Sequence, residues 1–190
     1  LERIASNFGP ENIAACIVEP IAGSTGTLVP PKGYLQRLRE ICDKHGILLI
    51  FDEVITGWGR TGSVFASHEF GVTPDLMTMA KATTNGVVPM GVVACKDEIY
   101  DAVMDSSPMG SVELFHGYTY SGIPVAVAAG LAVQDIFEKE DIFNRAKNLA
   151  PYFQKGLFSL QDLDSIENIR GYGMMGGIDM KMRTKPGKAG

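Results

Sequence analysis

The stretch that decides the fold contains two apolar runs, each followed by a charged residue. The first is Ile47-Leu48-Leu49-Ile50-Phe51, followed by Asp52-Glu53, and the second is Leu76-Met77-Thr78-Met79-Ala80, followed by Lys81. The first run has no polar residue, which predicts a strand of a parallel sheet covered on both faces by helices. Because ligands of such sheets bind beyond the carboxyl ends of the strands, Asp52 and Lys81 mark the predicted site.

The segment before this stretch predicts a strand that runs in the same direction. Residues 13–18 form a predicted strand and residues 33–44 a predicted amphipathic helix, so together with the Ile47 strand they make a βαβ unit. Glu19, which ends the first strand, is then expected at the same sheet edge as Asp52. A site role and the capping of the following loop are about equally consistent with its carboxylate. The alternation of strands and helices predicts an α/β fold with a mostly parallel sheet flanked by helices.

The pattern changes near residue 141. Predicted helices over residues 124–138 and 141–160 are followed by two short predicted strands, 166–170 and 174–180. We therefore expect residues 1–140 to form part of a large domain, and residues 141–190 to form a connecting helix and the start of a smaller C-terminal α+β domain. The sequence begins without methionine and ends just after a strand-like run, so we expect it to be a piece of a longer protein.

Composition excludes several classes of function. The chain has 190 residues, 45% of them hydrophobic, and a net charge of −5, with basic residues too scattered to predict nucleic-acid binding. The longest nearly apolar run, residues 123–133, is shorter than the roughly 20 residues of a membrane-spanning helix. The three cysteines lack metal-ligand spacing and are expected as reduced core thiols, which favours a cytoplasmic protein, and no metal site is predicted.

Two motifs suggest nucleotide binding, and both are incomplete. The run Gly57-Trp58-Gly59-Arg60-Thr61-Gly62 matches GxGxxG, but it does not open a long helix, and Lys81 stands where a dinucleotide site needs an acidic residue. The strand that ends in Asp52-Glu53 resembles the acidic strand of P-loop NTPases, but the string GxxxxGK[ST] is absent from this sequence. Both interpretations stay open as less favoured alternatives.

A carboxylate at one strand end and a lysine at another suit pyridoxal phosphate. The lysine forms a Schiff base with the cofactor, and the carboxylate pairs with the ring nitrogen, so that the ring accepts electrons when a substrate C–H bond breaks. The apolar strand before Lys81 is expected to desolvate its ammonium group and favour the neutral amine. An ion pair, or a strand-end lysine that reaches into water, is about equally consistent with the chemistry alone.

Several strings resemble the class III (ω-amino acid) aminotransferases. They are Phe51-Asp52-Glu53-Val54-Ile55-Thr56 with the Gly-rich run that follows, Pro74 to Lys81, Val18-Glu19-Pro20, Thr84-Asn85-Gly86 and His116-Gly117-Tyr118-Thr119-Tyr120-Ser121. They occur in the order of the family, and together they are most similar to its ω-amino acid:pyruvate (β-alanine:pyruvate) branch.

The resemblance implies a type I pyridoxal-phosphate fold, with a large domain, a small C-terminal domain, and sites at the subunit interface of a homodimer or homotetramer. It implies transamination from an ω-amino acid or amine, such as β-alanine, to pyruvate or a similar keto acid. An aminomutase or decarboxylase of the same fold stays open, and a catalytically inactive paralogue is a further alternative.

The resemblance also implies roles for individual residues. Lys81 would form the internal aldimine with pyridoxal 5'-phosphate and then move a proton between the substrate Cα and the cofactor C4′. Asp52 would pair with the pyridine nitrogen, Val54 would pack on one face of the ring, and Thr119 would hydrogen-bond the phosphate, held by the neighbouring subunit. Arg60 is expected to be structural.

Some features depart from the family pattern. Ile55 stands where many members have a glutamine near the phenolic oxygen of the cofactor, Trp58 replaces a usual phenylalanine, and Ile123 replaces a histidine. The phosphate loop, the second ring-stacking residue and the arginine that binds the substrate carboxylate are expected outside this sequence. This stretch alone is therefore expected to be inactive.

Overall fold

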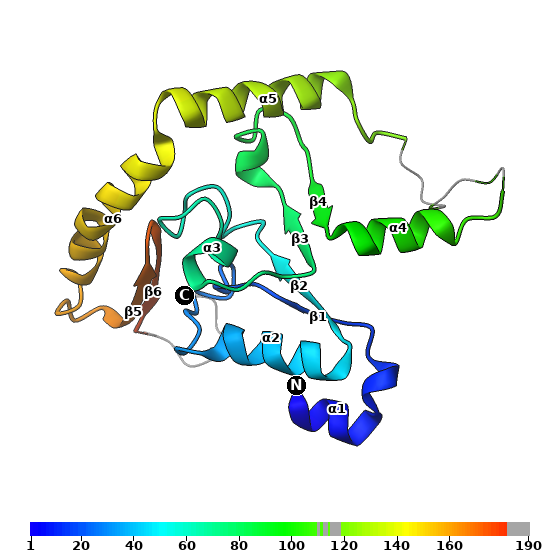
Figure 1. Cartoon of the computed structure of the whole chain (residues 1–190). Helices are drawn as coiled ribbons and strands as arrows, with labels where there is room; N and C mark the ends of the chain where they lie inside the picture. Colours follow the sequence, from blue (N-terminus) through cyan, green and yellow to red (C-terminus); the bar gives the residue numbers. More distant parts are fainter. Residues whose placement is uncertain (110, 112–113, 115–118, 182–190) are drawn as a thin grey trace, which may run out of the picture.

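Strands and helices alternate along the first half of the chain, as predicted (Figure 1). The computed structural model describes residues 1–109, 111, 114 and 119–181. Its elements are α1 (Glu2–Phe8), η1 (Pro10–Asn12), β1 (Ala15–Val18), α2 (Tyr34–His45), β2 (Leu48–Asp52), α3 (Ala66–Phe70), β3 (Leu76–Met79), η2 (Lys81–Thr83), β4 (Val92–Cys95), α4 (Asp97–Asp105), α5 (Pro124–Lys139), α6 (Ile142–Phe158), β5 (Ile166–Tyr172) and β6 (Met175–Met180), where η marks a 3-10 helix.

The central sheet has the order β1-β2-β3-β4. The pairs β1–β2 and β2–β3 are parallel, whereas β3–β4 is antiparallel, so the prediction of a mostly parallel sheet is confirmed. Val18 pairs with Phe51, and Asp52 pairs with Thr78. The carboxyl ends of the first three strands therefore meet at one edge, as the βαβ unit requires.

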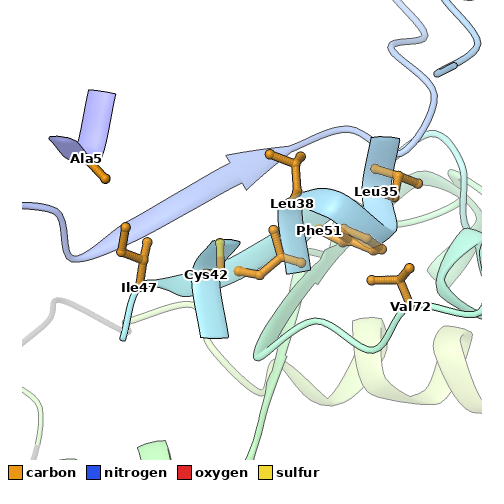
Figure 2. Close-up of a cluster of buried hydrophobic side chains, with 8 residues drawn as sticks. Ala5, Leu35, Leu38, Cys42, Ile47, Phe51 and Val72 are labelled. Carbon is orange, nitrogen blue, oxygen red and sulfur yellow. The ribbon is translucent and has the colours of Figure 1, made fainter. Parts of the chain in front are cut away.

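The apolar core lies between α2 and one face of the sheet. Leu35 and Leu38 of α2 and Phe51 of β2 are all buried, and Figure 2 shows them pointing into one cluster. Burial of a side chain of this size contributes about 1.5–3 kcal/mol relative to exposure, so this cluster holds the helix against the strands. The helix ends at Gly46, whose left-handed φ of 66° suits a residue without Cβ.

The opposite face of the sheet is partly open, so the expectation that β2 is covered on both faces is wrong for the described residues. Ile17 of β1 is 62% exposed, Leu48 of β2 36% and Val93 of β4 65%. Because side chains alternate along a strand, Leu49 and Phe51 face α2, whereas Leu48 and Ile50 face the other way. An apolar run shows that both faces are apolar, but not what covers each of them.

A charge cluster at the start of β3 ties three elements together. The buried Asp75 carboxylate accepts hydrogen bonds from the backbone N–H of Leu49 at 2.7 Å and from Arg39 at 2.8 Å. Its other oxygen lies 2.6 Å from the Lys96 ammonium. Burial alone would raise the pKa of Asp75, but these donors outweigh it and hold the pKa below its usual value.

The second half of the chain returns to the first through a hairpin. Figure 1 shows α5 and α6 forming an arc that leads to β5 and β6. The backbone N–H of Met174, between the two strands, donates to the Arg60 carbonyl at 2.8 Å. Arg170 of β5 pairs with Asp179 of β6 and donates to the Gly26 carbonyl at 2.8 Å. The predicted strand pair is confirmed, and a domain boundary near residue 141 stays a prediction.

Two features limit other classes of site. Among the described helices, none combines the length and the apolar character needed to cross a membrane. The described residues also hold no group of three or more His, Cys, Asp or Glu side chains placed to bind a metal. The three cysteines are free thiols, of which Cys42 is buried and Cys95 exposed, so the expected core position is wrong for Cys95.

Candidate active site

The sheet brings the two predicted site residues to one edge. Asp52 is the last residue of β2 and pairs in register with Thr78 of β3. Lys81 follows the end of β3 by two residues and opens η2. No ion pair joins Asp52 to Lys81 in the part of the chain that the structure describes. The alternative of a plain ion pair therefore has no support.

The Asp52 carboxylate is held through one of its two oxygens. Oδ1 accepts the backbone N–H of Val54 at 3.0 Å and the Thr78 hydroxyl at 3.1 Å. Oδ2 accepts no hydrogen bond from the described residues, and Asp52 is half-buried. The side chain is thus oriented by the protein while one charged oxygen can accept an N–H from a ligand.

Lys81 leaves the sheet instead of continuing it. The residue is exposed, so the expectation that the preceding strand would desolvate its amine is not met. Its φ of 50° places it in the left-handed region, which is disfavoured for residues with a Cβ. Its carbonyl accepts the backbone N–H of Gly86 at 3.1 Å, which closes the turn. Its ammonium makes no ion pair or side-chain hydrogen bond with the described residues.

Glu53 is a residue whose role the sequence did not predict. It is fully buried, and its carboxylate accepts the backbone N–H groups of Ala66 and Ser67, each at 2.7 Å, and the Thr56 hydroxyl at 2.9 Å. Its own backbone N–H donates to the Thr78 carbonyl at 2.9 Å. Glu53 therefore joins the loop after β2 to the start of α3 and to β3. The sequence signal was a second acidic residue directly after Asp52.

The Gly-rich run over residues 57–62 forms a loop and does not open a long helix. The next helix, α3, has five residues and begins at Ala66. The half-buried Arg60 donates to the Ile55 carbonyl at 2.9 Å, and burial lowers the pKa of its guanidinium. Arg60 thus has the structural role that we expected, and the geometry gives no support to a dinucleotide site.

Trp58 connects this loop to the turn that carries Lys81. Its indole N–H donates to the Thr83 hydroxyl at 3.1 Å. The ring lies 5.0 Å from Phe65 and 5.7 Å from Phe137 of α5, measured between ring centroids. Tryptophan, in place of the phenylalanine usual in the family, adds a hydrogen-bond donor at this point. The family pattern identified the replacement but did not predict its contact with Thr83.

Three other residues singled out from the sequence, Glu19, Val54 and Ile55, lie near the carboxyl ends of β1 and β2. Val54 is half-buried and lies in a turn directly after β2, and its packing on the cofactor ring stays a prediction. Glu19 accepts the backbone N–H of Gly23 at 2.9 Å, which favours the capping role. Ile55 packs against the same Gly23, where an added Cβ would lie 2.8 Å from the Ile55 Cδ1 atom.

Thr119 lies at a separate hollow. It is exposed, and it lines a cavity of about 610 Å³ together with Pro89, Met90 and residues at the start of α5. Neither Asp52 nor Lys81 lines this cavity. Of the string 116–121 that resembles the family, residues 116–118 lie outside the described residues.

Relatives of known name share this sequence over nearly its whole length. The chain is 56% identical over 183 residues to an omega-aminotransferase of Caulobacter vibrioides, and the match covers 96% of this chain and 42% of that protein. It is also 56% identical over 173 residues to a beta-alanine--pyruvate aminotransferase of Pseudomonas aeruginosa, covering 90% of this chain and 39% of that protein. The chain thus spans about two fifths of the length of these relatives.

The fold also matches that of solved omega-transaminase structures. An (S)-enantioselective omega-transaminase of Thermomicrobium roseum superposes with a TM-score of 0.88 at 39% identity, over 95% of this chain and 39% of that one. The family described as aminotransferase class-III matches residues 1–188. The chain belongs to the class III aminotransferase family.

Proposed function

We propose that the full-length protein carrying this chain transfers an amino group from an ω-amino acid or amine to pyruvate, with pyridoxal phosphate held by Lys81 and Asp52. The observation that carries this proposal is the pair of adjacent strand ends. They present one carboxylate oxygen and one amine that have no partner among the described residues. The names of two relatives, an omega-aminotransferase and a beta-alanine--pyruvate aminotransferase, support the choice of donor and acceptor.

The residues present fit the cofactor. Asp52 keeps Oδ1 for Val54 and Thr78 and leaves Oδ2 for the N–H of a pyridine ring. When bound, pyridoxal phosphate supplies an electron sink for the electrons of a substrate C–H bond. Lys81 would hold the cofactor through its Nζ atom. Once the substrate amine has displaced Lys81 from the cofactor, the free Nζ atom would carry the transferred proton. Its exposed position leaves the amine accessible to the aldehyde group.

Further residues complete the proposed site. Val54, next to Asp52, would pack on one face of the ring, and Thr119 would hydrogen-bond the phosphate in a second copy of the chain. The location of Thr119 at a hollow that neither Asp52 nor Lys81 lines supports its action on another subunit. A type I pyridoxal-phosphate fold, assembled as a homodimer or homotetramer with residues 141–190 entering a smaller domain, follows from the same proposal.

The test is covalent labelling of the full-length protein. Incubation with pyridoxal phosphate, reduction with borohydride, digestion and mass spectrometry are expected to find one label per chain, on Lys81. Lys81→Ala should abolish the label, whereas Lys32→Ala, which removes an exposed lysine far from both strand ends in sequence, should leave it unchanged. Alanine production from β-alanine and pyruvate then tests the substrates. Labels scattered over surface lysines, or none, would overturn the assignment.

A further inference from the structure

We propose that Trp58 and Thr83 form a positioning pair that holds Lys81 in its left-handed conformation and so directs its amine. This inference rests on the proposed function, because it concerns the presentation of Lys81 to the cofactor. Neither residue stands at a strand end, and nothing in their local sequence pattern predicts their contact.

The conformation of Lys81 needs an external cause. A φ of 50° is unfavourable for a residue with a Cβ, and such a conformation persists only where the surrounding structure determines it. Ala80, just before it, is close to fully extended, with φ −160° and ψ −149°, so the chain changes direction at Lys81, directly after the peptide that joins the two residues. The groups that bind this peptide therefore decide where the Lys81 side chain begins.

A chain of hydrogen bonds ends on that peptide. The Ala80 carbonyl accepts both the Thr83 hydroxyl and the Thr83 backbone N–H, each at 3.0 Å. The same hydroxyl accepts the Trp58 indole N–H at 3.1 Å. Thr83 is 5% exposed, so its hydroxyl is used both as donor and as acceptor inside the protein.

The donor itself is held in place by its packing. The Trp58 ring lies against Phe65 at an interplanar angle of 60° and is stacked on Phe137 at 30°. Phe65 lies in the loop before α3, and Phe137 lies near the end of α5. The indole N–H is thus fixed by two segments distant in sequence, and it transmits their position to the turn that carries Lys81.

Conservative variants of the full-length protein separate this role from simple packing. Trp58→Phe keeps the aromatic ring and removes the donor, and Thr83→Val keeps the volume and removes the hydroxyl. Trp58→Phe is expected to weaken the equilibrium affinity for pyridoxal phosphate about tenfold, the effect of losing roughly one hydrogen bond. Thr83→Val also removes the bond to the Ala80 carbonyl, so its affinity should fall by at least as much. Affinity is measured from the visible absorbance of the Schiff base, titrated against the unloaded protein.

The pairing makes two sharper predictions. The double variant should bind the cofactor no more weakly than Thr83→Val alone, because Trp58→Phe acts through the Thr83 hydroxyl that Thr83→Val already removes. Thr83→Ser, which restores the hydroxyl, should recover most of the affinity. Thr73→Val is the matched control, because Thr73 is exposed and its hydroxyl makes no hydrogen bond with the described residues.

The outcomes are distinct. Single variants with wild-type affinity would overturn the inference even if their melting temperatures fall, and so would effects that add in the double variant. Wild-type protein that fails to label at Lys81 would overturn the proposed function, and the inference with it. Wild-type labelling at Lys81 with unchanged affinity in the variants would overturn the positioning pair alone.

Discussion

Replacement of Glu53 by glutamine tests how strongly the loop after β2 is held. The Glu53 carboxylate is fully buried and accepts three hydrogen bonds, from Thr56, Ala66 and Ser67. A glutamine side chain offers one acceptor oxygen. If that oxygen takes the place of Oε2, the side chain keeps the bonds from Thr56 and Ala66. Its NH₂ group then faces the backbone N–H of Ser67, which loses its acceptor.

The expected loss of stability follows from these contacts. A hydrogen bond to a charged acceptor contributes about 1.5–3 kcal/mol, and a buried donor left without a partner costs a similar amount. Glu53→Gln loses the bond from Ser67 and places two donors, the glutamine NH₂ group and the Ser67 N–H, against each other. We therefore expect the free energy of unfolding to fall by roughly 2–4 kcal/mol. Glu53→Ala, which strands three donors and leaves a cavity, should lose more.

The measurement uses urea-induced unfolding of the full-length protein together with amide hydrogen exchange. Glu53→Gln should lower the midpoint and should speed exchange at Ala66 and Ser67 in particular. Glu11→Gln, at an exposed carboxylate, is the control and should change neither. Stability within about 0.5 kcal/mol of wild type, the usual range for a neutral surface change, together with unchanged protection of both amides, would refute this account of the loop.

Three further predictions concern single contacts. Thr78→Val, which removes a donor to Asp52, should weaken pyridoxal-phosphate binding about tenfold in an absorbance titration, and Thr78→Ser should restore it. Asp75→Asn should be less stable than wild type at pH 7 in urea unfolding. Because the folded pKa of Asp75 lies below its unfolded value, the difference should be complete above about pH 4 and shrink as the pH falls further. Burial and the hydrogen bond to Glu69 raise the pKa of Tyr172 to about 12, so the stability from this phenol should be lost above about pH 10. Tyr172→Phe should remove the latest step of the ultraviolet pH titration. If the variant instead loses a step near pH 10 and keeps the latest one, the prediction is contradicted.

The placement of Asp52 and Lys81 was predictable because it depends on local patterns. An apolar run of five residues defines a strand, and a crossover connection such as the one that contains α3, between β2 and β3, makes two neighbouring strands parallel. Parallel strands end at the same edge, so the residues that follow them become neighbours. The observed pairing of Asp52 with Thr78, three residues before Lys81, is the outcome of these rules.

The conformation at the strand ends was not predictable in the same way. The pattern around residues 76–81 indicates a strand but not the turn that puts Lys81 at φ 50° and exposes it. That turn depends on Trp58, which lies 25 residues before its partner Thr83. Hydropathy periodicity records which side chains avoid water, and it carries no information on a hydrogen bond between two distant loops.

The loop that joins β2 to α3 therefore determines the site as much as the strands do. Glu53 binds the two ends of this loop together, and Trp58 links its middle to the Lys81 turn. The Arg60 carbonyl accepts the backbone N–H of Met174, in the β5–β6 turn. At the hairpin, Gly173 has φ 57°, and an added Cβ would lie 2.5 Å from that same carbonyl oxygen. The close approach leaves no room for a side chain, so the β5–β6 turn and the loop pack backbone against backbone.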